Sequence, residues 1–228
     1  MKLYEYNQLP DLLINAHPSE LVPILRGPSL IHIEGQKKEP IFITTLLHGN
    51  ETTGFYALQR LLKKYNDNLP RSVSIFIGNI LSAEKGVRHL PNQIDYNRIW
   101  NGGTRPENKI AHSVIQKMKE RRPFASIDIH NNTGENPFYA CVNSIETHHL
   151  SLAQKFSDLI VYFIEPHEVQ SMAFSKFCPS IALECGLPGK EEGIKKVEQF
   201  LERLLKLDYL GPVISDPILY FSEAGVDF

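Results

Sequence analysis

The sequence predicts an α/β fold in three layers, with helices on both faces of a mixed, mostly parallel central sheet. Short apolar runs typical of strands alternate along the chain with longer segments of helical periodicity. This alternation indicates βαβ units, whose crossover connections make neighbouring strands parallel. Several of the apolar runs end at a histidine or a glutamate, and ligands bind outside the carboxyl ends of the strands in such sheets.

The patterns place strands and helices at defined positions. The expected strands are the apolar runs Leu30–Ile33, Ile41–Leu47, Val73–Ile77, Ala125–Ile129, Leu159–Ile164 and Ile181–Glu184. The expected helices are Thr53–Tyr65, Glu107–Arg121, His149–Ser157 and Lys190–Leu205. In the first of these helices, Phe55, Leu58 and Leu61 fall on one face.

The last part of the chain, after about Leu207, has a different pattern. Gly211–Phe221 combines a Gly-Pro pair with short apolar runs, which is typical of a turn followed by one or two short strands. We therefore expect a main domain over residues 1–207 and a short C-terminal β segment over residues 208–228.

Composition excludes several classes of protein. A hydrophobic fraction of 42% and a charged fraction of 22% are ordinary for a globular protein, and a net charge of −2 gives no basic surface for nucleic acid. No apolar run approaches the roughly 20 residues that cross a bilayer, and the first residues lack the apolar segment of a signal peptide. Three cysteines without metal-site spacing are typical of reduced thiols in a cytoplasmic protein.

His48-Gly49-Asn50-Glu51 directly follows the apolar run Ile41–Leu47. Imidazole nitrogen and carboxylate oxygen are both zinc ligands, and a catalytic zinc needs three protein ligands and one open position. The spacing alone is weak, because His17-Pro18-Ser19-Glu20 repeats it in what the proline and serine indicate is a surface turn. The position at a strand end makes His48 and Glu51 the candidate ligands.

A second strand ends in a histidine at His130. His130 is the candidate third ligand, and Asp128 points to the same side of an extended strand, where it can orient a ligand imidazole. The alternative is a structural histidine bonded to a backbone carbonyl. Only the combination with His48 and Glu51 argues against that alternative.

Glu184 ends the strand Ile181–Glu184. A carboxylate in an apolar setting is costly without a partner. Near a zinc-bound water it can take a proton as the water attacks a carbonyl and then deliver that proton to the leaving amine. The alternative is a glutamate that caps a helix or pairs with Lys190.

The segment from Gly86 to Ile99 has the composition of a loop, where functional residues concentrate. Arg98 can hold a substrate carboxylate through two parallel hydrogen bonds, with Asn97 adding another. Arg88 can stabilise the oxyanion of a tetrahedral intermediate. Both arginines can equally be solvated surface charges, and the residues alone leave the two interpretations open.

Four motifs stand in a fixed order along the chain: His48-Gly49-Asn50-Glu51, Asp95-Tyr96-Asn97-Arg98, Asp128-Ile129-His130-Asn131 and Leu183-Glu184-Cys185-Gly186. In this order they resemble the motifs of the succinylglutamate desuccinylase/aspartoacylase family, which belongs to the zinc carboxypeptidase superfamily. Four ordered motifs are far more specific than one. The resemblance implies a three-layer zinc-carboxypeptidase-like fold with one Zn²⁺ per chain.

The resemblance also implies roles for the residues discussed above: His48, Glu51 and His130 as zinc ligands, Glu184 as general base, Arg88 on the scissile carbonyl, and Asn97 with Arg98 on the amino-acid carboxylate. Family members usually carry a C-terminal β domain that helps to shape the pocket. Residues 208–228 would be a remnant or the beginning of such a domain.

One departure from the family bears on the substrate. Aspartoacylase-like enzymes hold a second substrate carboxylate with a further arginine, whereas this chain has no arginine between Arg122 and Arg203. Lys176 and His167 are candidates to replace it, but lysine lacks the planar fork. An uncharged acyl group or a peptide therefore fits better than N-acetylaspartate or succinylglutamate.

The leading hypothesis is a zinc-dependent hydrolase that cleaves the amide bond of an N-acyl amino acid or a similar small carboxylate-bearing substrate. A zinc-bound water would attack the carbonyl, with Glu184 as general base. The alternatives are a metallocarboxypeptidase that acts on short peptides and a non-catalytic metal-binding domain. No nucleic acid or membrane partner is expected, and a homo-oligomer is compatible with the sequence.

Overall fold

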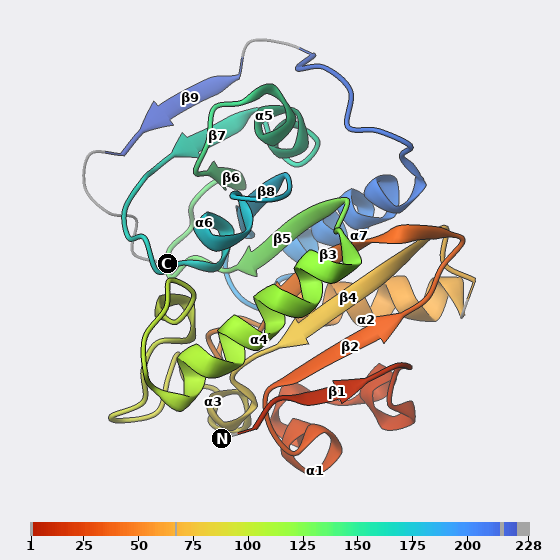
Figure 1. Ribbon diagram of the computed structural model, residues 1–228, viewed down its shortest axis with the longest axis vertical. Coiled ribbons are helices and arrows are strands. Elements are labelled where there is room, and N and C mark those ends of the chain that lie inside the picture. The colour runs from red at the N-terminus through yellow and green to blue at the C-terminus, as the bar shows by residue number, and fades with distance from the viewer. Residues whose placement is uncertain (1, 67, 215–216, 223–228) are drawn as a thin grey trace.

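The computed structural model describes residues 2–66, 68–214 and 217–222, and its centre is one nine-stranded sheet with the order β1-β2-β4-β3-β5-β8-β6-β7-β9 (Figure 1). The strands are β1 (Tyr4–Tyr6), β2 (Ser29–Ile33), β3 (Lys37–Thr45), β4 (Arg71–Ile77), β5 (Ala125–His130), β6 (Tyr139–Val142), β7 (Leu159–Tyr162), β8 (Ser180–Glu184) and β9 (Ile218–Phe221). The helices are α1 (Leu21–Leu25), α2 (Thr53–Tyr65), α3 (Ile80–Lys85), α4 (Pro106–Arg121), α5 (Thr147–Gln154), α6 (Gln170–Phe174) and α7 (Glu191–Lys206), with short 3-10 turns η1 (Asp11–Asn15), η2 (Pro18–Glu20) and η3 (Tyr96–Arg98).

The sheet is mixed and mostly parallel. Among the described strands, antiparallel pairing occurs at β2–β4 and at β6–β8, and the other neighbouring pairs are parallel. The four central strands β4, β3, β5 and β8 therefore run in one direction. Their carboxyl ends meet at one edge of the sheet, where His130 of β5 is the register partner of Glu184 of β8.

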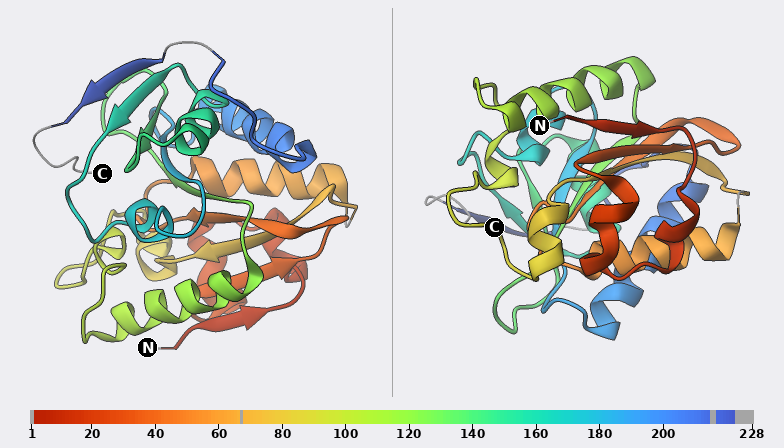
Figure 2. Two further views of the ribbon diagram at one scale, coloured as in Figure 1. Left: turned by 45° about the horizontal axis from the view of Figure 1, so that its top comes forward. Right: turned by 90° about the horizontal axis from the view of Figure 1, so that it is seen from below.

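Helices cover both faces of the sheet, as the sequence predicts. Figure 2 shows α4 on one side and α2 with α7 on the other. Side chains alternate along β5, so Ile127 and Ile129 join the core under α2 and α7. Phe42 and Phe76 pack on the opposite face with Phe174 of α6 and the apolar side of α4. This three-layer arrangement confirms the predicted fold class.

β3 ends two residues earlier than the predicted strand Ile41–Leu47, at Thr45. Leu46 has a φ of 53°, which lies outside the range of regular extended strands. The bend is held by the backbone N–H of Asn79, which donates to Leu46 O at 2.7 Å. The chain therefore turns out of the sheet before His48, and the motif stands in a bent connection rather than directly on a strand.

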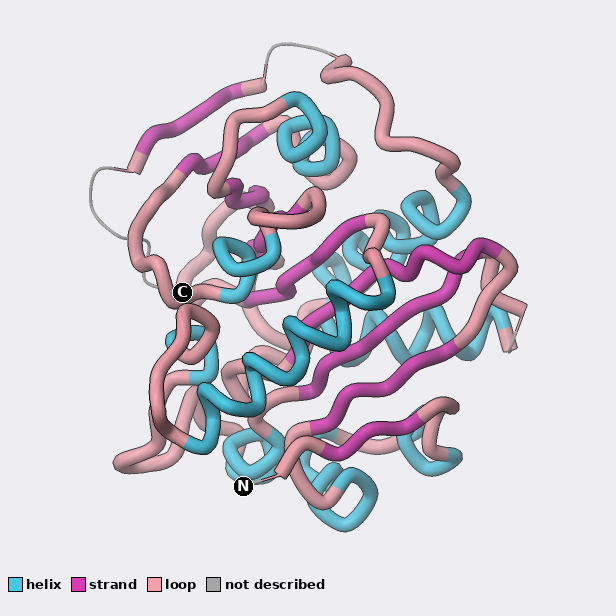
Figure 3. Tube along the Cα trace, in the orientation of Figure 1, coloured by secondary structure: helices cyan, strands magenta, loops and turns pink. Residues whose placement is uncertain are grey.

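Several short elements escape prediction from the sequence. Strands β1 and β6 and helices α1, α3 and α6 have six residues or fewer each, too few for a periodic pattern to be recognised. β9 lies in the segment Gly211–Phe221, where one or two short strands are predicted. β7 and α5 also end earlier than predicted, at Tyr162 and Gln154. Figure 3 shows the long connection between α3 and α4, interrupted by η3, at the carboxyl-end side of the sheet.

The C-terminal segment contributes β9, which pairs in parallel with β7 at the edge of the sheet. The division of the chain after residue 207 stays a prediction, and part of the predicted β segment (215–216 and 223–228) lies outside the described residues. Within the described residues, no helix combines the length and apolar character needed to cross a membrane. Cys141, Cys178 and Cys185 are buried free thiols.

Gly49 allows the connection after β3 to pass directly over α3. A Cβ at this position would lie 2.2 Å from both Ala83 N and Ser82 C, far closer than non-bonded atoms approach. The backbone N–H of Gly49 donates to Arg88 O at 3.1 Å. Glycine is therefore required to hold the segment between His48 and Glu51 against α3.

We expect Gly49→Ala to lower the free energy of unfolding by about 1–3 kcal/mol, because the methyl group must displace helix backbone. Thermal unfolding of the purified protein measures the effect. The matched control is Gly134→Ala, because a Cβ there meets nothing within 4 Å. Equal melting temperatures for the two variants would contradict the role of Gly49.

Candidate active site

Glu51 lies between His48 and His130, and both imidazoles face it with Nδ1. The distance from His48 Nδ1 to Glu51 Oε1 is 2.8 Å, and that from His130 Nδ1 to Glu51 Oε2 is also 2.8 Å. All three residues are buried, and their candidate ligand atoms lie within 4.8 Å of one another. The three ligands predicted from sequence are thus brought together.

A carboxylate stands behind each imidazole. Asp95 Oδ1 lies 2.9 Å from His48 Nε2, and Asp128 Oδ2 lies 2.9 Å from His130 Nε2. Asp128 is itself held by the hydroxyl of Thr44, its register partner on β3. A carboxylate on the far nitrogen fixes the ring orientation and leaves Nδ1 as the coordinating atom, which is the usual arrangement of metal-binding histidines.

The electrostatics of this group favour a positive charge at its centre. Burial alone would raise the pKa of Glu51, but His48 and His130 lower it to about 2. Burial likewise disfavours charged imidazoles, yet Glu51 with Asp95 raises the pKa of His48, and Asp128 with Glu51 raises the pKa of His130 well above its usual value. A divalent cation bound to the same atoms would replace the protons on the two imidazoles.

A second group of potential ligands, Glu146, His148 and His149, does not match these properties. Glu146 and His148 are exposed, and the group stands at the N-terminus of α5. The positive end of the helix dipole there disfavours a cation. The buried group around Glu51 is therefore the candidate metal centre.

Glu184 ends β8 beside His130 and is only 2% exposed. Among the described residues its hydrogen-bond partner is Asn132, whose Nδ2 donates to Glu184 Oε2 at 2.7 Å, and not the alternative partner Lys190. Burial raises the pKa of Glu184 to about 7, with the charge of His130 opposing the shift and that of Glu51 adding to it. A carboxyl group with such a pKa is suited to proton transfer at neutral pH.

Arg88 reaches the ligand set from the loop after α3. Its Nη2 donates to Asp95 Oδ2 at 3.0 Å, and its Nη1 lies 3.7 Å from Glu51 Oε1. The side chain is 35% exposed, so it touches the buried cluster and solvent together. This position suits the predicted contact with a developing oxyanion, and the role itself stays a prediction.

Asn97 and Arg98 lie in η3, next to the same cluster. Asn97 is buried, with Nδ2 3.2 Å from His130 Nε2 and Oδ1 accepting from the backbone N–H of Gln170 at 3.0 Å. Arg98 is partly buried, and its Nη1 donates to Asn97 O at 3.0 Å. The described contacts of the Asn97 side chain go to the protein, and the substrate contacts of both residues stay predictions.

The sequence did not reveal the contacts that three residues make at the site. Asp95 belongs to a motif quoted above, but its contact with His48 depends on how the loop after α3 folds. Asn132 directly follows Asn131 at the end of β5, and this polar pair at a strand end was the available signal. Tyr139 is the register partner of Glu184 on β6, and its hydroxyl lies 3.3 Å from Asn132 Nδ2.

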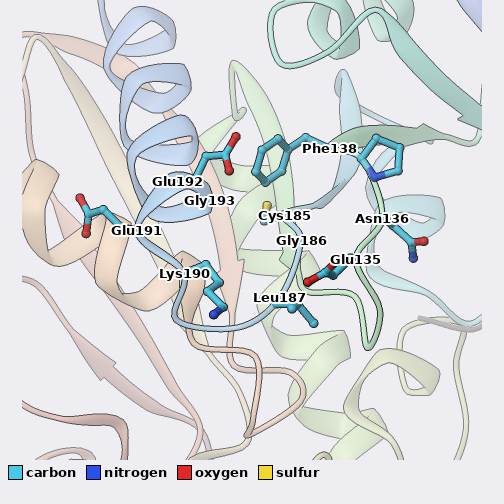
Figure 4. Close-up of a pocket in the computed structure, with 11 residues that line it drawn as sticks. Glu135, Asn136, Phe138, Cys185, Gly186, Leu187, Lys190, Glu191, Glu192 and Gly193 are labelled. Carbon is cyan, nitrogen blue, oxygen red and sulfur yellow. The ribbon is translucent and has the colours of Figure 1, made fainter.

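An open pocket of about 670 Å³ lies between the loop before β6 and the start of α7 (Figure 4). Phe138, Leu187 and Lys190 contribute to its lining, together with Cys185. Cys185 follows Glu184 and belongs to the core under α2 and α7, so the pocket lies across the sheet from the Glu184 side chain. None of the predicted site residues, all of which are described, lines it.

The fold and the buried group of His48, Glu51 and His130 define a three-layer α/β protein with a candidate metal site at the carboxyl-end edge of its sheet. The model of the succinylglutamate desuccinylase/aspartoacylase catalytic domain matches residues 38–207. The chain therefore belongs to this family of hydrolases, as its ordered motifs predict. Among curated proteins, no sequence matches the chain.

Solved structures show the same fold at low sequence identity. The match to a succinylglutamate desuccinylase from Chromobacterium violaceum covers 84% of this chain and 72% of the desuccinylase chain, with 16% identity and a TM-score of 0.68. The match to the product-bound ectoine utilization protein EutE from Ruegeria pomeroyi covers 84% of this chain and 63% of the EutE chain, with 15% identity and a TM-score of 0.64. The match to a metallo-carboxypeptidase from Burkholderia cenocepacia covers 74% of this chain and 56% of the carboxypeptidase chain, with 13% identity and a TM-score of 0.57.

We expect His48→Ala and His130→Ala to abolish metal binding, because each removes one of the three candidate ligands. Zinc content after dialysis, measured by mass spectrometry, should fall from about one ion per chain to near zero. The control is His17→Ala, which has the same spacing to a glutamate but an exposed ring that bonds Ser19. Loss of zinc in the control, or its retention in either ligand variant, would contradict the assignment.

Proposed function

We propose that this protein is a zinc-dependent hydrolase that cleaves the amide bond of an N-acyl amino acid or a similar small carboxylate-bearing substrate. The observation that carries the proposal is the pairing of His130 with Glu184 at the ends of adjacent parallel strands. It sets a candidate proton acceptor beside a buried set of metal ligands, on the same face of the sheet.

The residues of the buried group fit one Zn²⁺. Two imidazole nitrogens and a carboxylate oxygen form the donor set of catalytic zinc sites, and each imidazole is backed by a carboxylate. When bound, zinc would polarise the substrate carbonyl and lower the pKa of a water molecule to about 7.

The protein's own residues would carry the proton and hold the substrate. Glu184 takes a proton from the water as the new carbon–oxygen bond forms, and delivers it to the nitrogen as the carbon–nitrogen bond breaks. Arg88, anchored by Asp95, donates to the oxyanion. Arg98 with Asn97 holds the carboxylate of the amino acid. The products are a carboxylic acid and a free amino acid.

The acyl group is proposed to be uncharged. A second carboxylate on the substrate needs a cation on the acyl side, and the sequence has no arginine between Arg122 and Arg203. Lys176 and His167, the candidate replacements, are both exposed.

We also propose a cytoplasmic location for the protein. The buried free thiols support it, because thiols stay reduced in that compartment.

A hydrolysis screen tests this function. Zinc-loaded protein is given N-acyl amino acids with varied acyl chains and, in parallel, short unmodified peptides, and release of free amino acid is measured. We expect turnover of N-acyl amino acids with uncharged acyl chains. Preferential release from peptides would favour a carboxypeptidase, and zinc binding without hydrolysis of either class would indicate a non-catalytic domain.

In the same assay, Glu184→Gln should retain zinc and lose about 10²–10⁴-fold in kcat, because the amide cannot accept the proton. The matched control is Glu192→Gln, an exposed glutamate in the pocket across the sheet, which should keep wild-type activity. Near-normal turnover by Glu184→Gln would remove Glu184 from its role.

The pH dependence follows from the same carboxyl group. Burial raises the pKa of Glu184 from 4.5 to about 7, and only the ionised form accepts a proton. Because a bound cation favours the ionised form, we expect kcat/KM to rise with pH through a pKa between 4.5 and about 7. The profile is measured with the fastest N-acyl amino acid. A rate that falls as pH rises through this range would contradict the assignment.

A further inference from the structure

The chain after β5 carries two adjacent asparagines with different partners. Asn131 Nδ2 donates to Thr53 Oγ1 and to Gly186 O, both at 2.8 Å, and thereby ties the first turn of α2 to the segment after β8. The backbone N–H of Asn132 also donates to Gly186 O, at 3.0 Å. The segments that leave β5 and β8 are therefore held side by side beyond the sheet.

The side chain of Asn132 reaches the carboxylate of Glu184 from this position. Asn132 Nδ2 donates to Glu184 Oε2 at 2.7 Å and lies 3.3 Å from Tyr139 OH. Tyr139 is fixed opposite Glu184 by the β6–β8 pairing. A side-chain amide nitrogen carries two hydrogens, so each of them has an acceptor, and the plane of the amide is fixed.

The orientation of this amide is set by charge. Asn132 is 9% exposed, and its Oδ1 is buried without a hydrogen-bond partner among the described residues. Rotating the amide by 180° would place Oδ1 against an oxygen of ionised Glu184, so two acceptors would be in contact. An unsatisfied neutral carbonyl costs less than an unsatisfied buried carboxylate, which explains why the donors face Glu184.

We propose that Asn132 is the positioning residue of Glu184: it holds Oε2 and leaves Oε1 as the oxygen that takes the proton. The inference rests on the proposed function and adds a residue to it. A carboxylate held through one oxygen cannot rotate freely, so the other oxygen keeps a constant position relative to the neighbouring ligand His130.

Kinetics of two variants test the role in the zinc-loaded, full-length protein. Asn132→Ala removes the donor, and Asn132→Asp keeps the shape but places an acceptor against Glu184. With the fastest N-acyl amino acid of the screen, we expect kcat to fall about 10–100-fold in both, as for other residues that orient catalytic groups, with unchanged KM and zinc content. Asn132→Asp is isosteric, so it keeps the test available if the alanine variant does not fold.

A double variant separates positioning from a general structural effect. If Asn132 acts through Glu184, adding Asn132→Ala to Glu184→Gln should cause less than about a twofold further loss, since the two residues form one coupled unit. Independent residues would instead show losses that multiply. Tyr139→Phe, which removes only the acceptor of the second amide hydrogen, should produce a smaller loss than Asn132→Ala.

Nuclear magnetic resonance provides a readout that needs no activity. The side-chain NH₂ signals of Asn132, assigned by their absence in Asn132→Asp, should shift in Glu184→Gln and stay in place in the control Glu192→Gln. Any of three results would overturn the inference. They are a wild-type kcat in Asn132→Asp, losses that multiply in the double variant, and Asn132 NH₂ signals that do not shift in Glu184→Gln. The proposed function fails separately, if wild-type protein releases no amino acid from any N-acyl amino acid.

Discussion

The site depends on one buried carboxylate, that of Glu51, which joins the connection after β3 to the end of β5. One oxygen faces His48, and the other faces His130 and also accepts from the backbone N–H of Asn131 at 3.3 Å. With an exposure of 5%, Glu51 needs its charge balanced locally. The raised pKa values of the two imidazoles favour the protonated forms that would supply this balance. A divalent cation bound to the same three residues would supply it without the protons.

The parallel sheet supplies the constraint around this carboxylate. β5 lies between β3 and β8, so His130 and Glu184 lie at the ends of adjacent strands, and the connection after β3 brings His48 and Glu51 beside them without a long loop. The surrounding charges reinforce the argument for a cation. Glu51, Asp95, Asp128 and Glu184 are four carboxylates in one cluster, and the guanidinium of Arg88 offsets only part of their charge when the imidazoles are neutral.

The sequence predicts what depends on long strands and on strand ends, and it fails where a loop decides the geometry. His130 and Glu184 are predictable because apolar runs lead to them. The bend at Leu46 is not, since a non-glycine residue with positive φ leaves no local signal. Asp95 acquires its partner through the fold of the loop that contains η3. The contacts of the Asn97 amide with His130 and with the first residue of α6 are likewise absent from the sequence pattern, because tertiary contacts in that loop cannot be read from spacing.

The two sides of the site differ in charge, and this difference bears on the orientation of the substrate. Arg88 and Arg98 both come from the loop before α4, so the carboxylate of the proposed substrate would be attracted to that side. The other side presents the neutral polar groups of Asn132 and Tyr139 together with Glu184. A second carboxylate placed there would meet the negative charge of Glu184 in a buried setting, where like charges repel strongly. In the proposed reaction, an acyl chain without charge would avoid this repulsion and leave Glu184 ionised, so the electrostatics that suit Glu184 to the role of general base would also favour an uncharged acyl group.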